Sequence, residues 1–177
     1  MDLTRWFEAQ LQASAEGFVW SVEQVLPERQ CAPPPGPAGG LGEWSAARHA
    51  FHLLYYEREA ALPLLQEWPR QPFLTLAGYF EREEAAWASA PSLPTILEEF
   101  RTLRTAQLAL IREFGEAAWE EAPETAWGHE TLRWIVAKTY QHTLEHANDA
   151  LRLALFWDRI ANLNRCLEAD KQARTPA

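Results

Sequence analysis

Apolar residues recur at steps of three and four positions along five stretches of the chain. This spacing is typical of helices that bury one face. Pro27 should end the first helix because proline cannot continue one, and Ser45 is a suitable N-terminal cap for the second. The helices that we expect span residues 3–26, 45–67, 74–89, 94–121 and 130–157.

The segment between the first two helices, CAPPPGPAGGLGE at positions 31–43, consists mainly of proline and glycine. It predicts a long loop, and no stretch of the chain shows the alternation of a strand. The expected fold is therefore all-α: a four-helix bundle with a short extra helix between its second and third helices and a long Pro/Gly loop after its first. Residues 1–167 should form this single domain, and residues 168–177 a frayed tail.

The length, charge and cysteine spacing of the chain exclude several classes of protein and of binding partner. The chain has 177 residues, enough for one domain with a core, and a net charge of −9 without a basic patch. Nucleic acid and anionic membrane surfaces are therefore not expected partners. The start of the chain does not resemble a signal peptide, no apolar run is long enough to span a membrane, and the two cysteines do not have a scaffold or zinc-finger spacing. We expect a cytoplasmic protein.

The stretch YQHTLEHAND, within the last long helix, carries the most informative chemistry. His142 and His146 are four residues apart and therefore lie on the same face of a helix, about 40° apart around its axis. Both fall within or beside the apolar stripe, so their rings should point inward. Two neutral imidazoles can offer lone pairs to one cation, which makes this pair half of a metal site. Two ordinary core histidines are the alternative interpretation.

The second helix supplies a further candidate ligand. On a helical wheel His52 lies about 90° from the centre of the apolar stripe, at the core margin, whereas His49 lies about 160° away and should face solvent. Bundles build metal sites from side chains on facing helices, so His52 can join His142 and His146. Three histidines leave a coordination position open for water, a thiolate or a substrate oxygen. Imidazole suits Zn, Ni, Cu and Fe(II), so the ligands alone do not select the metal.

Two other kinds of metal site can be weighed against this one. The string HTLEH matches the HxxEH motif of a peptidase family, in which Glu145 would be the general base. The sequence shows no other part of a peptidase architecture, notably no strands. If the protein is not a peptidase, Glu145 is a solvated residue or contacts a metal-ligating histidine. A ferritin-like di-iron centre needs glutamate three positions before histidine on two helices. The residues at those positions are His49, Thr139 and Thr143.

No general base is fixed by the sequence, and the catalytic residues remain unknown. Tyr56 and Glu59 follow His52 on nearly the same helical face, and Lys138 precedes His142 by one turn. Each is a candidate, and each is equally compatible with packing or surface exposure.

Two other polar features are expected to have no part in the chemistry. The charged run at positions 81–84 should form the solvated face of the short helix. His129, just before the last helix, should be structural or exposed.

Three motifs follow one another along the chain: Trp44-Ser45 followed by His52-Leu53, the L-x-x-F-x-x-x-R pattern from Leu97 to Arg104, and Gly128-x-x-Thr131-Leu132 followed by His142 and His146. In this order they resemble the motifs of the DinB/YfiT-like superfamily over about residues 3–157. The chain departs from the family pattern in its longer Pro/Gly loop and in Asp149, which stands where the family usually has glutamine after the last histidine.

The resemblance implies a four-helix bundle with a three-histidine site for Zn or Ni. It also implies one of two chemistries: metal-dependent hydrolysis, or transfer or isomerisation with a low-molecular-weight thiol such as bacillithiol or mycothiol. We therefore expect a metal-dependent enzyme with a small-molecule substrate. The alternative is a non-catalytic metal-binding or dimerising bundle, which would act as a homodimer.

Overall fold

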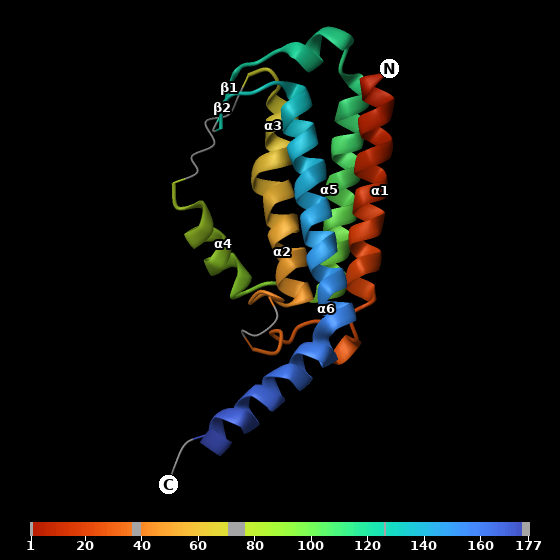
Figure 1. The fold of residues 1–177 in the computed structure, drawn as a ribbon. Helices are drawn as coiled ribbons and strands as arrows, with labels where there is room; N and C mark the ends of the chain where they lie inside the picture. Colours follow the sequence, from red (N-terminus) through yellow and green to blue (C-terminus); the bar gives the residue numbers. More distant parts are fainter. Residues whose placement is uncertain (1, 37–39, 71–76, 126, 175–177) are drawn as a thin grey trace.

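The computed structural model describes residues 2–36, 40–70, 77–125 and 127–174, in which four long helical segments stand side by side (Figure 1). The first segment packs mainly against the third and fourth, and the second also packs against the third and fourth. The prediction of an all-α four-helix bundle is confirmed. The segments are α1 (Leu3–Glu23), α2 with its continuation α3, α5 (Leu93–Glu113) and α6 (Leu132–Arg174).

The second segment is one continuous helix with an irregular turn. Its cap is as expected, because the Ser45 hydroxyl accepts a hydrogen bond from the Arg48 backbone N–H at 3.1 Å. A π-helical turn precedes Pro63, which lacks the N–H that a regular turn requires there. Glu57, the first residue of that turn, is fully buried. The parts are α2 (Ala46–Tyr56), the π turn (Glu57–Ala61) and α3 (Leu62–Glu67).

The connections differ from the expected ones in several places. The third long helix ends at Glu113 and not near residue 121, because Phe114 adopts an extended conformation immediately before Gly115. Positions 37–39 of the loop and 74–76 of the expected short helix lie outside the described residues. The shorter elements are two 3₁₀ turns (Pro27–Arg29 and Glu116–Glu120), α4 (Tyr79–Trp87), and the antiparallel pair β1 (Glu124–Thr125) and β2 (Gly128–His129).

The core fills the space between the four long segments. Phe18 of α1 and Phe100 of α5 are fully buried and meet edge to face, with their ring centroids 5.5 Å apart. All eleven residues of α2 are buried, because α4 and the loop that precedes α2 cover the side that the bundle leaves open (Figure 1). This complete burial of α2 determines where its histidines lie.

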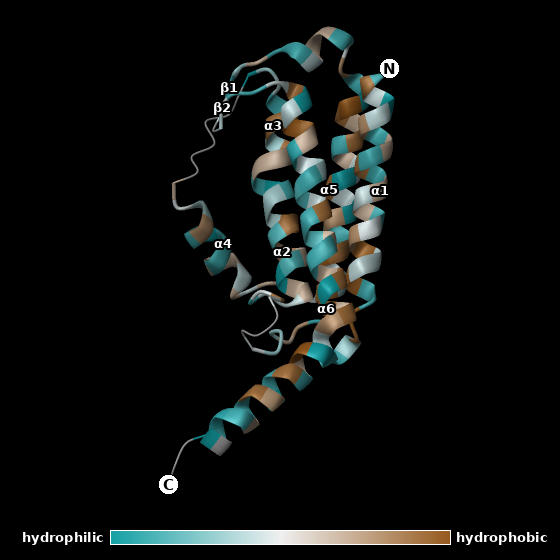
Figure 2. Cartoon of the chain, viewed as in Figure 1, coloured by the Kyte–Doolittle hydropathy of each residue, from teal (hydrophilic) through white to brown (hydrophobic). Residues whose placement is uncertain are grey.

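The last helix continues past the end of the bundle (Figure 1). Residues 168–174, expected to be frayed, are its last helical turns, and the division into a 1–167 domain and a 168–177 tail stays a prediction. Apolar residues recur along the projecting part (Figure 2). Several apolar side chains in the C-terminal half of α6 are exposed, including Leu155 at 70% and Leu163 at 45%. None of the helices in the described part of the chain combines the length and hydropathy that crossing a membrane requires.

Candidate metal centre

The three histidines predicted from the sequence lie together between α2 and α6. The Nε2 atom of His142 is 3.1 Å from Nε2 of His52 and 3.1 Å from Nε2 of His146. One ligand atom from each residue can be chosen so that all three lie within 4.8 Å of one another, close enough to hold one metal ion. The helical spacing accounts for His142 and His146, and the contact between α2 and α6 brings in His52.

The three Nε2 atoms cannot all be joined by hydrogen bonds, because the neutral rings carry too few N–H groups. A neutral imidazole has one N–H and one bare nitrogen. His52 directs Nδ1 at the Glu83 carboxylate, with 2.9 and 3.0 Å to its two oxygens, so its Nε2 carries a lone pair. A proton on His142 Nε2 can serve only one of its two neighbours. A cation satisfies all three nitrogens at once, so the residues present fit a metal ion.

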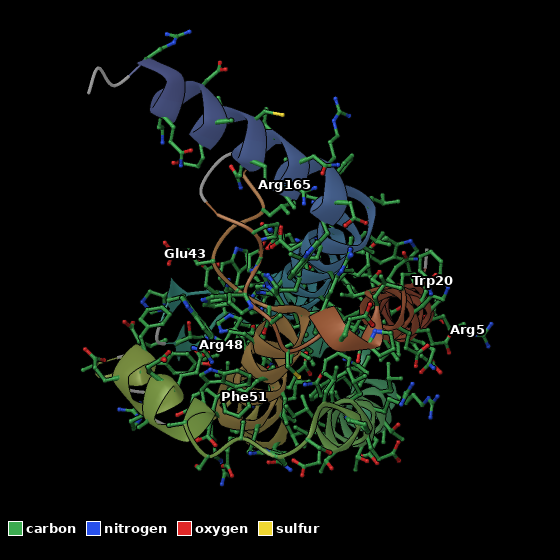
Figure 3. All side chains as sticks on the ribbon, turned by 90° about the horizontal axis from the view of Figure 1, so that it is seen from below. Arg5, Trp20, Glu43, Arg48, Phe51 and Arg165 are labelled. Carbon is green, nitrogen blue, oxygen red and sulfur yellow. The ribbon has the colours of Figure 1, made fainter. Side chains whose placement is uncertain are left out.

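Glu83 holds His52 in this orientation from α4. Its carboxylate also pairs with the Arg48 guanidinium at 2.9 Å, and Arg48 reaches Glu84 at 2.9 Å. Arg48 lies on the side of α2 that faces α4 (Figure 3). A carboxylate that accepts the second N–H of a histidine fixes its tautomer and makes it a better ligand.

The prediction that the charged run lies on a solvated helical face is wrong for Glu83, which is 1% exposed. Tyr79, Glu83 and Trp87 follow one another at four-residue steps on α4, and the two aromatic residues pack against the core beside α2. Glu83 is therefore on the inner face of the helix. This aromatic spacing was the signal in the sequence that could have identified it.

The prediction that His49 faces solvent is also wrong, because this residue is only 6% exposed and its ring lies against that of His146. The two Nδ1 atoms are 2.8 Å apart, within hydrogen-bond distance. The helical wheel assumed one buried face, but Trp44 covers the other side of α2, with its ring centroid 5.3 Å from that of His49. His49 thus contacts the second nitrogen of a predicted ligand.

His146 also belongs to a second group of possible ligands. Its Nδ1 is 3.9 Å from an Asp149 carboxylate oxygen, which is 4.0 Å from His49 Nδ1. His49, His146 and Asp149 can likewise each direct one ligand atom to within 4.8 Å of the others. The imidazole of His146 therefore joins the two groups through its two different nitrogens.

Burial keeps His49, His142 and His146 neutral. It lowers the pKa of His142 to about 3, that of His146 to about 2 and that of His49 to about 4, and the neighbouring histidines act in the same direction. Neutral imidazole is the form that binds a metal. Burial also raises the pKa of Tyr56 to about 12, and its ring centroid is 4.6 Å from that of His142. Tyr56 is therefore a hydrogen-bond donor at neutral pH and not a base.

Two cavities border the histidines, and each is lined by a different pair of them. One, of about 220 Å³, is lined by His52 and His142 together with four aromatic side chains and Lys138. The other, of about 410 Å³, is lined by His49, His146 and residues 40–44 of the loop before α2. The histidines are therefore accessible to small molecules despite their burial.

Several other candidate residues lie elsewhere. Glu59 and Glu145 are exposed on the outer faces of their helices. His129 is exposed as well and pairs with Glu124 across the hairpin, at 2.8 Å. Of the three suggested bases, only Tyr56 and Lys138 border the cavity at the histidines.

Comparison with known proteins agrees with this architecture. The family model of the DinB superfamily matches residues 3–150, a range that includes all three histidines of the predicted site. No match was found among curated proteins or among solved structures. Because the family model covers most of the chain, the protein belongs to the DinB superfamily.

Proposed function

We propose that this protein is a metal-dependent enzyme that acts on a small-molecule substrate. In this proposal His52, His142 and His146 hold one divalent ion, Zn²⁺ or Ni²⁺. The observation that carries the proposal is the convergence of three Nε2 atoms that have too few protons to bond with one another. When bound, such an ion supplies Lewis acidity, which promotes deprotonation of a water molecule or a thiol near neutral pH. The reaction is accordingly hydrolysis or transfer to a low-molecular-weight thiol.

The surrounding side chains prepare the site for either reaction. Glu83 and Arg48 keep His52 in the tautomer that binds a metal. The Tyr56 hydroxyl keeps its proton and lies 3.4 Å from the Thr139 hydroxyl, to which it can donate. A substrate oxygen or sulfur that approaches His142 would compete with Thr139 for this donor. Four aromatic side chains form most of the wall of the adjoining cavity, so a substrate there would meet a mainly apolar surface.

A peptidase based on the HTLEH string is less well supported. Its general base would be Glu145, which is exposed, and it does not require a ligand from α2. The position of His52, 3.1 Å from His142, favours the three-histidine site.

A non-catalytic role as a dimerising bundle has one observation in its favour. The C-terminal half of α6 exposes Leu155, Phe156, Leu163 and Leu167, and a second copy of the chain could cover these side chains. If this were the main function, sedimentation would give a dimer that Leu163→Glu dissociates. The protein would then show no turnover whatever metal it carried.

Metal analysis of purified protein tests the proposal. We expect about one Zn²⁺ or Ni²⁺ per chain in the wild type and little in His142→Ala or His52→Ala. Glu145→Ala, one turn along the same helix and exposed, is the matched control and should keep its metal. Equal metal content in wild type and His142→Ala would overturn the proposal, and full retention in His52→Ala alone would revive the peptidase.

The choice between the two reactions needs an assay of the metal-loaded protein. Ester and amide hydrolysis should be measured beside thiol addition to an electrophile. Turnover that disappears in His142→Ala would assign the reaction, and its absence on all substrates with metal bound would favour the non-catalytic bundle.

A further inference from the structure

The cavity next to His52 and His142 has one charged group in its wall. Lys138 is one of only two lysines in a chain of net charge −9. It precedes His142 by one turn of α6, so both side chains lie on the same face of that helix. The cavity therefore combines two of the proposed ligands with a cation.

Lys138 is not neutralised by the protein around it. In the described part of the chain, no carboxylate lies within ion-pair distance of its Nζ, although 25 acidic residues are available in the sequence. Its nearest aromatic neighbours are Trp127 and Trp134, each with a ring centroid 6.0 Å from Nζ. A half-buried ammonium beside indole rings favours an anion that can approach it from the cavity.

The remaining walls are mainly aromatic. Tyr56, Tyr79, Phe80 and Trp127 surround the space, and Phe80 is 73% exposed at its edge. The Tyr79 hydroxyl is buried and has no hydrogen-bond partner among the described residues. Such walls suit a flat apolar body, and the hydroxyl offers it one polar contact.

The cavity beside His49 and His146 has different charged groups in its wall. Its Arg152 faces Asp149, with Nη1 and Oδ1 3.7 Å apart, and also donates to the Gly40 carbonyl. Glu43 adds a further carboxylate to the lining. The positive charge there is already matched, so that side offers an anion no unpaired partner.

We propose that the cavity beside Lys138 binds the substrate, and that the substrate is a small carboxylate with a flat apolar or aromatic body. The carboxylate pairs with the Lys138 ammonium, the body packs against the aromatic walls, and the part that reacts lies next to His52 and His142. The role of this ligand as substrate rests on the proposed function, whereas its binding depends only on the cavity.

Binding of benzoate and of benzamide, its uncharged counterpart of nearly the same shape, tests the inference. Titrations followed by NMR would use the wild type, Lys138→Gln and Lys171→Gln, each in metal-free and Zn²⁺-loaded form. Lys171→Gln removes the same charge from the only other lysine, which pairs with Glu168 near the end of α6. Circular dichroism and thermal denaturation would verify that both variants are folded.

In metal-free wild type we expect benzoate to bind roughly tenfold or more tightly than benzamide, as for a charge-assisted hydrogen bond. Lys138→Gln should remove this preference and Lys171→Gln should keep it. Equal binding of the two probes to the wild type, or a preference that survives Lys138→Gln, would overturn the inference. Zn²⁺ uptake in the same samples separates the two proposals, since benzoate preference without metal binding would contradict only the proposed function.

Discussion

Two buried polar clusters share the helix α6, and they differ in the groups that they bring together. In the first, Glu57 of the π turn meets Arg104 of α5, with an oxygen–nitrogen distance of 2.6 Å, and also accepts a hydrogen bond from Gln107. In the second, the nitrogens of three histidines face one another. The first cluster pairs opposite charges, and the second gathers lone pairs.

The difference indicates what each cluster is for. Arg104 also donates to the Thr143 hydroxyl at 2.9 Å and to the Leu11 carbonyl at 2.8 Å, so this cluster ties α1, α2, α5 and α6 together by itself. The histidine cluster needs a group from outside the chain to satisfy its nitrogens. Thr143 and His142 are neighbours in the sequence, so one turn of α6 serves both clusters. The comparison predicts that stability depends mainly on the first and metal binding on the second.

The largest effect should come from breaking the ion pair. Arg104→Met leaves the Glu57 carboxylate buried without its partner, and we expect the free energy of unfolding to fall by about 3–5 kcal/mol. Urea denaturation of the metal-free protein measures this loss. The double variant Glu57→Gln/Arg104→Met should recover part of it, because no charge is then left unpaired. A loss below about 1 kcal/mol in Arg104→Met would contradict the structural role.

A smaller effect is expected at the carboxylate that orients His52. Glu83→Gln keeps the shape of the side chain but removes its charge, so metal affinity should fall roughly 10- to 100-fold. Isothermal titration with Zn²⁺ gives the affinity. Glu84→Gln is the matched control, because Glu84 also pairs with Arg48 but does not contact His52. Equal losses in both variants would assign the effect to Arg48 and not to the hydrogen bond with His52.

The smallest of the expected effects is the pH dependence of the metal-free protein. Because the pKa of His49 falls from its ordinary value near 6.5 to about 4 on folding, the unfolded chain binds more protons between these values. Stability should therefore decrease as the pH falls below about 6.5. For one such histidine the loss between pH 7 and pH 5.5 is about 1 kcal/mol.

Urea denaturation at a series of pH values measures this dependence, and removing one histidine should weaken it. His142 and His146 should contribute in the same direction, since burial lowers both of their pKa values. Stability that stays level from pH 7 to pH 5 would show that the rings are not held neutral.

The sequence predicted those features that depend on the periodicity of single helices. The bundle, the inward position of His142 and His146, and the place of His52 at the core margin follow from the spacing of apolar residues. Their arrangement around a common point also required α2 and α6 to be neighbours, and the structure shows that these helices are in contact.

The features that the sequence did not predict depend on elements that cover a helix from outside the bundle. His49 is buried because Trp44 lies over the far side of α2, and Glu83 is buried because α4 packs there. A helical wheel treats each helix as though one face were solvated, and α2 has no such face. Glu57 was missed for a related reason, since a π turn changes the register that the wheel assumes.

The central claim is that three imidazoles share one metal ion, and anomalous diffraction tests it most directly. Crystals grown with Zn²⁺ would be measured on both sides of the zinc absorption edge. The account predicts one strong anomalous peak about 2.0–2.1 Å from Nε2 of His52, His142 and His146. A map without a peak between these rings, or with a peak that His52 does not contact, would contradict it.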